Sequence, residues 1–313
     1  MTPSVRVALL VALASCRDGR RAPASPPPAR PDAPLAARPA ADASAPPPRR
    51  ADLTVVDRSP WATLAPGVRW AKATLRLTPS PDAAHPDAAP RTLLWVATRL
   101  EVARVEVSVE RSPDDAIESL AERSRDAVLV TDSGFFEPGN DPSGVVISRG
   151  RTLHGGGPRG GSGVLAFAGD RVAVVPVDTR DGGTFAHDGG VTTALQCGPR
   201  VVDPGGRPGI YRHDGRFAAR TVACVRDGGR VLDVVTTWDV DDGRRGPELY
   251  DLATVLSGPS PLGDATGCEA ALNLDGGPST GLYLRDQASG GRTVFRHAPI
   301  GPTPWGLVVR PRG

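Results

Sequence analysis

Short apolar runs rich in Val, Leu and Thr recur along the last two-thirds of this 313-residue chain, separated by Gly, Pro and Asp. One of them, 102–109, alternates apolar and polar positions, as a half-buried strand does. Runs of this length between turn residues predict β-strands. We expect strands at 93–98, 102–109, 127–131, 144–148, 163–168, 172–177, 191–196, 221–226, 231–236, 270–274, 282–284, 293–295 and 307–309.

Two segments have helical spacing of their apolar residues instead. The first is 114–125, which Ser112 or Asp114 can cap. The second is 247–258, where Pro247 suits the first helical position. Many strands with only two helices predict an α+β fold, in which a mixed, largely antiparallel β-sheet core carries a few helices in a single domain.

The amino-terminal residues have the pattern of an export signal. A short basic segment, 1–6, precedes the apolar run 7–14, which is too short to cross a bilayer as a helix. The run ends in Leu13-Ala14-Ser15-Cys16, which resembles the lipobox of bacterial lipoproteins. The resemblance implies cleavage before Cys16 and acylation of its thiol. The alternative is an ordinary cleaved signal with an incidental cysteine.

Residues 17–50 have a different composition, mostly Pro, Ala, Arg and Asp with two Pro-Pro-Pro runs. Such a segment buries too little apolar surface to offset the entropy of ordering it. We therefore expect a signal peptide with its lipobox cysteine at 1–16, a disordered tether at 17–50 and one folded domain at 51–313. This organisation places the domain outside the cytoplasm, anchored to a membrane of the cell envelope on its periplasmic or cell-surface face.

Charge argues against nucleic acid as a partner. The chain has 37 Lys and Arg against 35 Asp and Glu, with no basic patch containing aromatic residues. Lys72 is the only lysine and follows no glycine-rich loop, which excludes a Walker-type phosphate loop.

A serine-esterase motif occurs near the carboxyl terminus. Gly277-Pro278-Ser279-Thr280-Gly281 matches G-x-S-x-G after a predicted strand, with Asp286 and His297 downstream in the order of an α/β-hydrolase. That fold needs a helix directly after the serine, whereas 282–284 has the pattern of a strand. An esterase using Ser279 is therefore the least favoured function.

Polar residues lie at the ends of four predicted strands. They are Asp132-Ser133-Gly134-Phe135-Phe136, Gln196-Cys197-Gly198-Pro199, Arg220-Thr221 and Asn273-Leu274-Asp275-Gly276-Gly277. Buried strands that end in polar groups next to glycines are typical of ligand sites at sheet edges. Each cluster alone could be a strand-terminating turn, but four together predict a site.

These four clusters resemble the motifs of the phosphodiester glycosidase domain, a family whose best-known member is the uncovering enzyme of the lysosomal pathway. The family motifs are Asn-Gly-Gly-Phe-Phe, Gln-Ser-Gly-Pro, Arg-Thr-Ala and Asn-Leu-Asp-Gly-Gly-Gly-Ser, in the order found here. The resemblance covers about 61–310, and its last motif is the most specific. The chain departs from it at Asp132 for Asn, Ser133 for Gly and Pro278 for Gly.

The resemblance implies hydrolysis of the bond between a sugar's anomeric carbon and a phosphodiester oxygen. An always-charged bidentate donor suits the phosphate, for which Arg220 is the candidate. An oxocarbenium-like transition state favours a carboxylate, for which Asp275 is the first candidate, as base, nucleophile or stabiliser. Asp132 could act as an acid or as a cation ligand.

The remaining expected site residues bind substrate. They are Asn273, Gln196, Thr221, Gly276, Gly277, Ser279 and Phe135. No cofactor is certain, although a divalent cation is possible. The expected partner is a glycan or sugar-phosphate substrate. The rival function is a non-catalytic, lipid-anchored protein that binds a glycan phosphate without turning it over.

Three cysteines lie in the expected domain, and their number leaves the pairing open. Against the family motifs, Cys197 stands in place of Ser and Cys224 in place of Gly. Because both follow strands of the implied site, we predict a Cys197–Cys224 disulfide, with Cys268 reduced and buried. A Cys224–Cys268 bridge is the alternative.

Overall fold

The computed structural model describes residues 52–79, 89–157, 159–177, 185 and 190–313. The predicted signal peptide, the lipobox residue Cys16 and the tether at 17–50 lie outside the described residues. Within the described part of the chain, no helix is long and apolar enough to cross a membrane.

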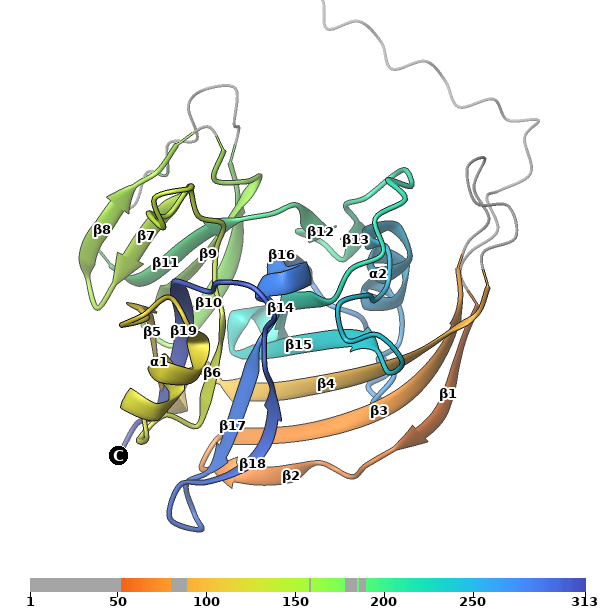
Figure 1. Ribbon diagram of the computed structural model, residues 1–313, viewed down its shortest axis with the longest axis horizontal. Helices are drawn as coiled ribbons and strands as arrows, with labels where there is room; N and C mark the ends of the chain where they lie inside the picture. Colours follow the sequence, from red (N-terminus) through yellow and green to blue (C-terminus); the bar gives the residue numbers. More distant parts are fainter. Residues whose placement is uncertain (1–51, 80–88, 158, 178–184, 186–189) are drawn as a thin grey trace, which may run out of the picture. The chain divides into compact units, whose positions relative to one another are not determined.

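The strands form three sheets (Figure 1), and every strand pair among the described residues is antiparallel. The first sheet has the order β1-β3-β4-β15-β14-β16-β12-β13, and β2 also pairs with β3. Its strands are β1 (Asp52–Arg58), β2 (Ala62–Ala65), β3 (Val68–Thr78), β4 (Arg91–Glu101), β12 (Arg200–Asp203), β13 (Arg207–Pro208), β14 (Arg220–Arg226), β15 (Val231–Asp239) and β16 (Ala270–Gly276).

The other two sheets lie to the left of the long strands of the first in Figure 1. The second has the order β10-β9-β11-β7-β8, and the third β18-β17-β6-β19-β5. The strands of the second are β7 (Val145–Ser148), β8 (Arg151–Gly155), β9 (Gly163–Ala168), β10 (Arg171–Pro176) and β11 (Val191–Cys197). Those of the third are β5 (Val105–Arg111), β6 (Leu129–Asp132), β17 (Leu282–Asp286), β18 (Arg292–His297) and β19 (Trp305–Pro311).

Helical structure is sparse in the described residues. The two α-helices are α1 (Ile117–Arg123) and α2 (Leu249–Ser257). Short 3₁₀ turns also occur at Val102–Arg104, Asp227–Gly229 and Gly277–Ser279. The single, largely antiparallel β domain expected from the sequence is confirmed. The fold is nevertheless richer in β-structure than the predicted α+β class, and its sheets contain no parallel pair in the described residues.

The first helix is shorter at its start than predicted. It begins after Ala116, and neither Ser112 nor Asp114 caps it. Instead Ser112 donates its hydroxyl to the Ala116 carbonyl, while Asp114 accepts from the Ser119 hydroxyl at 2.7 Å. These side chains stabilise a turn that precedes the helix, which is a common alternative use of Ser and Asp.

A central core fills the space between the three sheets, and a second apolar layer lies on the outer side of the first sheet. Successive residues of a strand point to opposite sides, so Ala223 and Val225 of β14 face the central core. Val222 and Cys224 face the outer layer, which α2 covers. The core thus lies directly behind the ends of β6, β11, β14 and β16.

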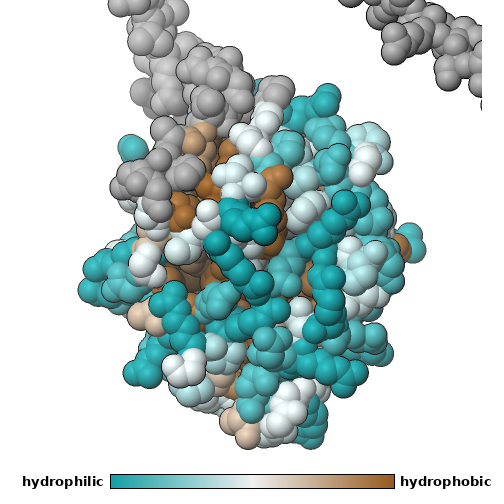
Figure 2. Space-filling model, turned by 90° about the vertical axis from the view of Figure 1, so that its left-hand side faces the viewer, coloured by the Kyte–Doolittle hydropathy of each residue, from teal (hydrophilic) through white to brown (hydrophobic). Residues whose placement is uncertain are grey.

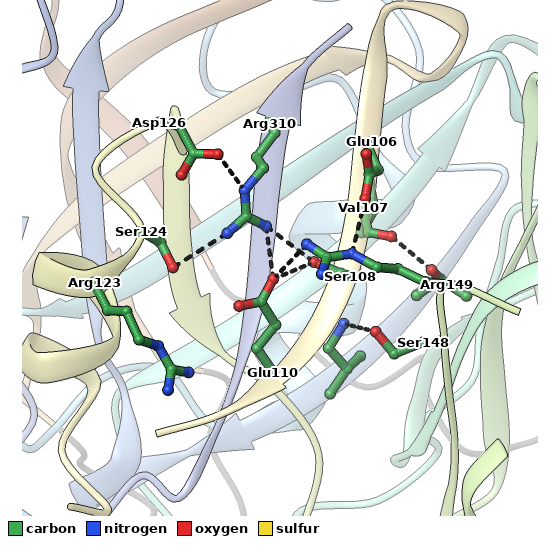
Figure 3. Close-up of polar contacts among 12 residues, drawn as sticks. Glu106, Val107, Ser108, Glu110, Arg123, Ser124, Asp126, Ser148, Arg149 and Arg310 are labelled. Atoms are coloured by element: carbon green, nitrogen blue, oxygen red, sulfur yellow. Dashed lines mark hydrogen bonds and ion pairs between the residues drawn. The ribbon is translucent and has the colours of Figure 1, made fainter. Parts of the chain in front are cut away.

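Polar contacts fix the second sheet against the third (Figure 3). On β5, Glu110 accepts hydrogen bonds from Arg310 of β19 at 2.6 Å and from Arg149 at 3.1 Å. Arg149 belongs to the turn between β7 and β8, and its neighbour Ser148 accepts the Val109 N–H at 3.1 Å. Figure 2 looks at this side of the molecule, where hydrophilic surface dominates the lower half and apolar surface gathers in the upper half. The bonds of Glu110 and Ser148 hold β5 of the third sheet against the end of β7 and the turn after it in the second.

The predicted Cys197–Cys224 disulfide is wrong, because the bridge joins Cys224 to Cys268 with a Cα–Cα distance of 5.4 Å. Cys224 points to the layer beneath α2, and Cys268 reaches the same layer from the segment before β16. Cys197 points to the central core, on the other side of the first sheet, and keeps a free, buried thiol. Strand alternation, and not distance along the chain, decides the pairing.

We predict that removing this bridge destabilises the domain. The Cys224→Ala/Cys268→Ala double variant should lower the free energy of unfolding by roughly 2–4 kcal/mol, since the bridge closes a loop with a sequence separation of 44. Denaturant titration measures this change. Peptide mapping without reductant should recover a Cys224–Cys268 peptide and a free thiol at Cys197. A recovered Cys197–Cys224 peptide would refute the assignment.

Candidate active site

Four strand ends meet where the three sheets join. The Asp275 N–H at the end of β16 donates to the Ser133 carbonyl, just after β6, at 2.8 Å. The Asn273 N–H donates to the Pro199 carbonyl, just after β11, at 3.0 Å. Arg220, which opens β14, pairs with Gly276 of β16. The structure therefore brings together all four polar clusters that the sequence singles out.

Asp275 lies near the end of β16 at this junction, and the residue is partly exposed. Burial raises the pKa of Asp275 to about 6, although a hydrogen bond from the Gly276 N–H and the nearby Ser279 hydroxyl act in the opposite direction. The Gly276 bond measures 2.9 Å. A partly exposed carboxyl with a pKa near neutrality can exchange protons with a ligand under physiological conditions.

The Asp132 carboxyl lies behind Asp275 and has no exposure to solvent. One of its oxygens, Oδ1, accepts hydrogen bonds from the Thr221 hydroxyl at 2.6 Å and the Gly281 N–H at 3.1 Å. The Thr131 hydroxyl lies 3.2 Å from the same oxygen and makes its shorter bond to the Gly281 carbonyl. Burial raises the pKa of Asp132 well above its ordinary value, and the charge of Asp275 adds to this effect. Asp132 is thus part of the site but is screened from any ligand by its neighbours.

Arg220 is 9% exposed, and backbone carbonyls hold its guanidinium in place. It donates to the Arg216 carbonyl at 2.8 Å and to the Pro247 carbonyl at 3.5 Å. Burial lowers the pKa of Arg220, whereas the nearby charges of Asp214 and Glu248 raise it. A cation held in this way keeps a fixed orientation beside the end of β16.

The buried Glu248, which precedes α2, supports the loop that holds Arg220. Its carboxylate accepts hydrogen bonds from the His213 ring at 2.6 Å, from the Gly215 N–H at 2.9 Å and from the Asp214 N–H. Sequence reasoning missed Glu248, because an acidic residue before a helix has the pattern of an ordinary helix start. Its total burial is what marks it, and burial is invisible in the sequence.

The two predicted amides have different surroundings. Gln196 is fully engaged with the backbone, since its Oε1 accepts the Val145 N–H at 3.0 Å and its Nε2 donates to the Gly161 carbonyl at 3.0 Å. It bridges β7 to the segment before β9. Asn273 donates to the Gly198 carbonyl at 3.0 Å, while its buried Oδ1 has no hydrogen-bond partner among the described residues.

The turn after β16 packs closely on β14. Gly277 has φ +58°, a conformation that favours glycine, and its N–H donates to the Ala219 carbonyl at 2.7 Å. A Cβ at Gly276 would lie 3.0 Å from the same carbonyl. Both glycines therefore allow the strands to approach, and the Gly276 and Gly277 amides bond to the protein itself.

Ser279 and Phe135 complete the predicted set. The Ser279 hydroxyl donates to the Pro302 carbonyl at 3.1 Å, and no histidine hydrogen-bonds it in the described part of the chain. The predicted strand follows it as β17, so the helix required after an esterase serine is not formed here. Phe135 packs against the central core.

Gly281 is a site residue whose role sequence reasoning missed. Its N–H bonds to Asp132, and its carbonyl accepts the Thr131 hydroxyl at 2.6 Å. Its only signal was its place as the last glycine of the G-x-S-x-G motif, which pointed to Ser279 instead. Cys197 also lies here. Burial and, to a smaller extent, the charge of Asp275 raise the pKa of its thiol.

The fold and these strand ends define a β-rich domain with two aspartates at the junction of three sheets and an arginine at the start of the adjoining strand β14. The sequence profile of the phosphodiester glycosidase family matches residues 125–309, which contain all four clusters. The chain therefore belongs to the phosphodiester glycosidase family. Among curated proteins, no sequence matches it.

Two solved structures share the fold at low sequence identity. The catalytic domain of zebrafish N-acetylglucosamine-1-phosphodiester alpha-N-acetylglucosaminidase, auto-inhibited by its pro-peptide, is 15% identical with a TM-score of 0.59, covering 84% of this chain and 89% of that one. A hypothetical protein from Synechocystis is 14% identical with a TM-score of 0.57, covering 86% of this chain. The match spans 65% of the Synechocystis chain, somewhat less than two-thirds of its length.

We predict that Asp275→Asn stabilises the domain at neutral and alkaline pH. The folded-state pKa of about 6 lies above the ordinary value of 3.8, so the wild type loses stability as pH rises between these values, whereas the amide does not titrate. Relative to pH 4, the variant should gain roughly 2 kcal/mol in free energy of unfolding by pH 8. Urea titrations at both pH values measure it. An equal difference between the two proteins at both pH values would contradict the raised pKa.

Proposed function

We propose that this domain hydrolyses a sugar-1-phosphodiester, releasing the sugar from the phosphate of an exported or cell-envelope glycan. The observation that carries the proposal is Asp275, the partly exposed carboxyl at the junction of the four clusters, with a pKa of about 6. Family membership supplies the reaction class. The substrate of the zebrafish enzyme, as its name gives it, supports the same bond type here.

The reaction breaks the bond between the anomeric carbon and the phosphate oxygen, and water supplies the hydroxyl and the proton. The phosphodiester leaves as a phosphate monoester, which needs less protonation than an alcohol. Asp275 supports the cationic transition state at the anomeric carbon, as base, nucleophile or electrostatic stabiliser. Arg220 balances the charge on the phosphate.

The rival function is a lipid-anchored protein that binds a glycan phosphate and does not turn it over. Both functions need Arg220 and the junction, but only hydrolysis needs an ionisable Asp275. An esterase based on Ser279 lacks support, because the Ser279 hydroxyl donates to a backbone carbonyl. The bonds of Gln196 to the backbone favour a supporting role for this residue over the predicted contact with substrate.

The test of hydrolysis is release of sugar by the purified protein from UDP-N-acetylglucosamine or a nitrophenyl sugar phosphodiester. We predict that Asp275→Asn lowers kcat by about a thousandfold or more, corresponding to about 4 kcal/mol of barrier. Since the same variant should be more stable at pH 8, loss of activity cannot be ascribed to unfolding. Wild-type rates in the variant would refute the role of Asp275. Saturable binding without turnover by the wild type would establish the rival function.

We predict that Arg220→Lys lowers kcat/KM by roughly ten- to a hundredfold, about 1.4–2.8 kcal/mol. Lysine keeps the charge, but it cannot present a planar fork to two phosphate oxygens while bonding to the Arg216 and Pro247 carbonyls. Steady-state kinetics measure the loss, and circular dichroism checks the fold. Unchanged kcat and KM would show that Arg220 acts only as a point charge or as a structural residue.

We propose that the protein is exported and anchored through an acylated Cys16. The Cys224–Cys268 disulfide supports an oxidising compartment, since such bridges are rare in the cytosol. We predict that Cys16→Ala abolishes membrane association and the acyl mass on the mature chain. Fractionation and intact-mass analysis test this. A wild-type mature chain that begins elsewhere and has no acyl group would contradict it.

A further inference from the structure

The two oxygens of Asp132 have opposite surroundings, although the whole side chain is buried. Oδ1 accepts two hydrogen bonds, from the Thr221 hydroxyl and the Gly281 N–H, and the Thr131 hydroxyl is a third polar neighbour. Oδ2 is buried and has no hydrogen-bond partner among the described residues. An ionised carboxylate shares its charge equally between its two oxygens. This environment gives hydrogen bonds to one charged oxygen and none to the other.

Compensation for a negative charge at Asp132 is also missing. Within the described residues no Arg, Lys or His lies within ion-pair distance of it. The titratable groups that face it are Asp275 from β16 and the Cys197 thiol from β11. From β14, β17 and β19 it meets Thr221, the segment at Gly281 and Gly306, none of which is charged. A buried, unpaired charge next to another carboxylate is strongly disfavoured, whereas a neutral acid is tolerated.

We propose that Asp132 acts as a neutral carboxylic acid, a positioning residue that has the hydrogen-bonding character of a side-chain amide. Its carbonyl-like Oδ1 gathers Thr131, Thr221 and Gly281, and so fixes β6, β14 and the start of β17 around Asp275. Its protonated Oδ2 adds no charge beside Asp275. The catalytic carboxyl of the junction can then ionise without a second anion behind it.

This assignment separates two aspartates that sequence alone treats alike. Asp275 must ionise and meets the ligand; Asp132 must remain neutral and does not. Because a carboxylic acid and a carboxamide have nearly the same shape, Asp132→Asn should preserve the junction, whereas Asp132→Ala should lose the hydrogen bonds from Thr221 and Gly281. The catalytic part of this inference rests on the proposed function, but its protonation part does not.

The first test is infrared difference spectroscopy of the full-length protein at pH 8, with Asp132→Asn as reference. At this pH Asp275, with a pKa of about 6, is ionised. We expect a carbonyl stretching band of a protonated carboxylic acid in the wild type that the variant lacks. A wild type without that band, showing a carboxylate band in its place, would overturn the inference whether or not the protein is an enzyme.

The second test compares the stability of the wild type with that of Asp132→Asn from pH 4 to 8. A folded-state pKa above the unfolded value makes the wild type lose stability as pH rises, and Asp275 titrates in both proteins. The unfolding equilibrium constant of the wild type should therefore rise relative to that of the variant by about tenfold per pH unit above pH 4. A pH-independent ratio would overturn the inference, as would a variant that fails to fold at every pH.

A chelator arm distinguishes the alternative of an ionised Asp132 that holds a cation. EDTA should leave the melting temperature of the wild type unchanged, because a neutral acid is a poor ligand for Ca²⁺ or Mg²⁺. If EDTA lowers the melting temperature of the wild type, added Ca²⁺ or Mg²⁺ reverses this change, and Asp132→Asn shows no such change, then Asp132 is ionised and binds a cation. That result would overturn the proposal.

If the protein turns over a sugar phosphodiester, the kinetics supply a third comparison. Asp132→Asn should restore activity lost in Asp132→Ala and should remove the decline of kcat that ionisation of Asp132 causes at alkaline pH. Inactivity of an Asp132→Asn variant that folds with wild-type stability would show that the carboxyl itself takes part in the reaction, which contradicts its role as a positioning residue.

Discussion

Withdrawal of carboxyl groups from water at the junction of three antiparallel sheets is the constraint on which the site depends. Strands β6, β14 and β16 end at the edge of a continuous apolar core, so the polar groups at their ends cannot all be hydrated. The protein satisfies part of them with its own hydrogen bonds: the Asp275 N–H donates to the Ser133 carbonyl, and the Thr221 hydroxyl and the Gly281 N–H donate to Asp132. The same bonds hold the strand ends together, so folding and the chemistry of the site have one origin.

Apolar runs between turn residues were enough to predict most strands, because a strand in a buried sheet has a local signature. Most residues of the site were also predictable, since polar residues at strand ends stand out from the runs that precede them. The three strands before residue 80 escaped prediction, although β3 alternates buried and exposed residues along its length. In β3 small and charged residues such as Ala71, Lys72 and Ala73 weaken the apolar pattern that a strand normally shows.

What the sequence could not supply is the side of the sheet that each residue faces in the assembled domain. Cys197 and Cys224 both follow site strands, yet the first points to the central core and the second to the layer under α2. Glu248 comes from a segment without any motif of its own, and the motif that contains Gly281 pointed to Ser279 instead. Departures from the family motifs are accommodated locally: Ser133 donates to the Trp305 carbonyl at 2.9 Å, and Gly301 leaves room for Pro278.

This environment explains why Asp can replace Asn at position 132: a neutral carboxylic acid can take the place of the amide in the family motif. The central claim is that one junction gives two aspartates different protonation states. Carbon-13 NMR of aspartate-labelled protein, titrated from pH 4 to 8, tests it most directly. The account predicts one carboxyl resonance with a midpoint at about 6, from Asp275, and one that stays protonated throughout, from Asp132. Titration of every aspartate near pH 4 would contradict it.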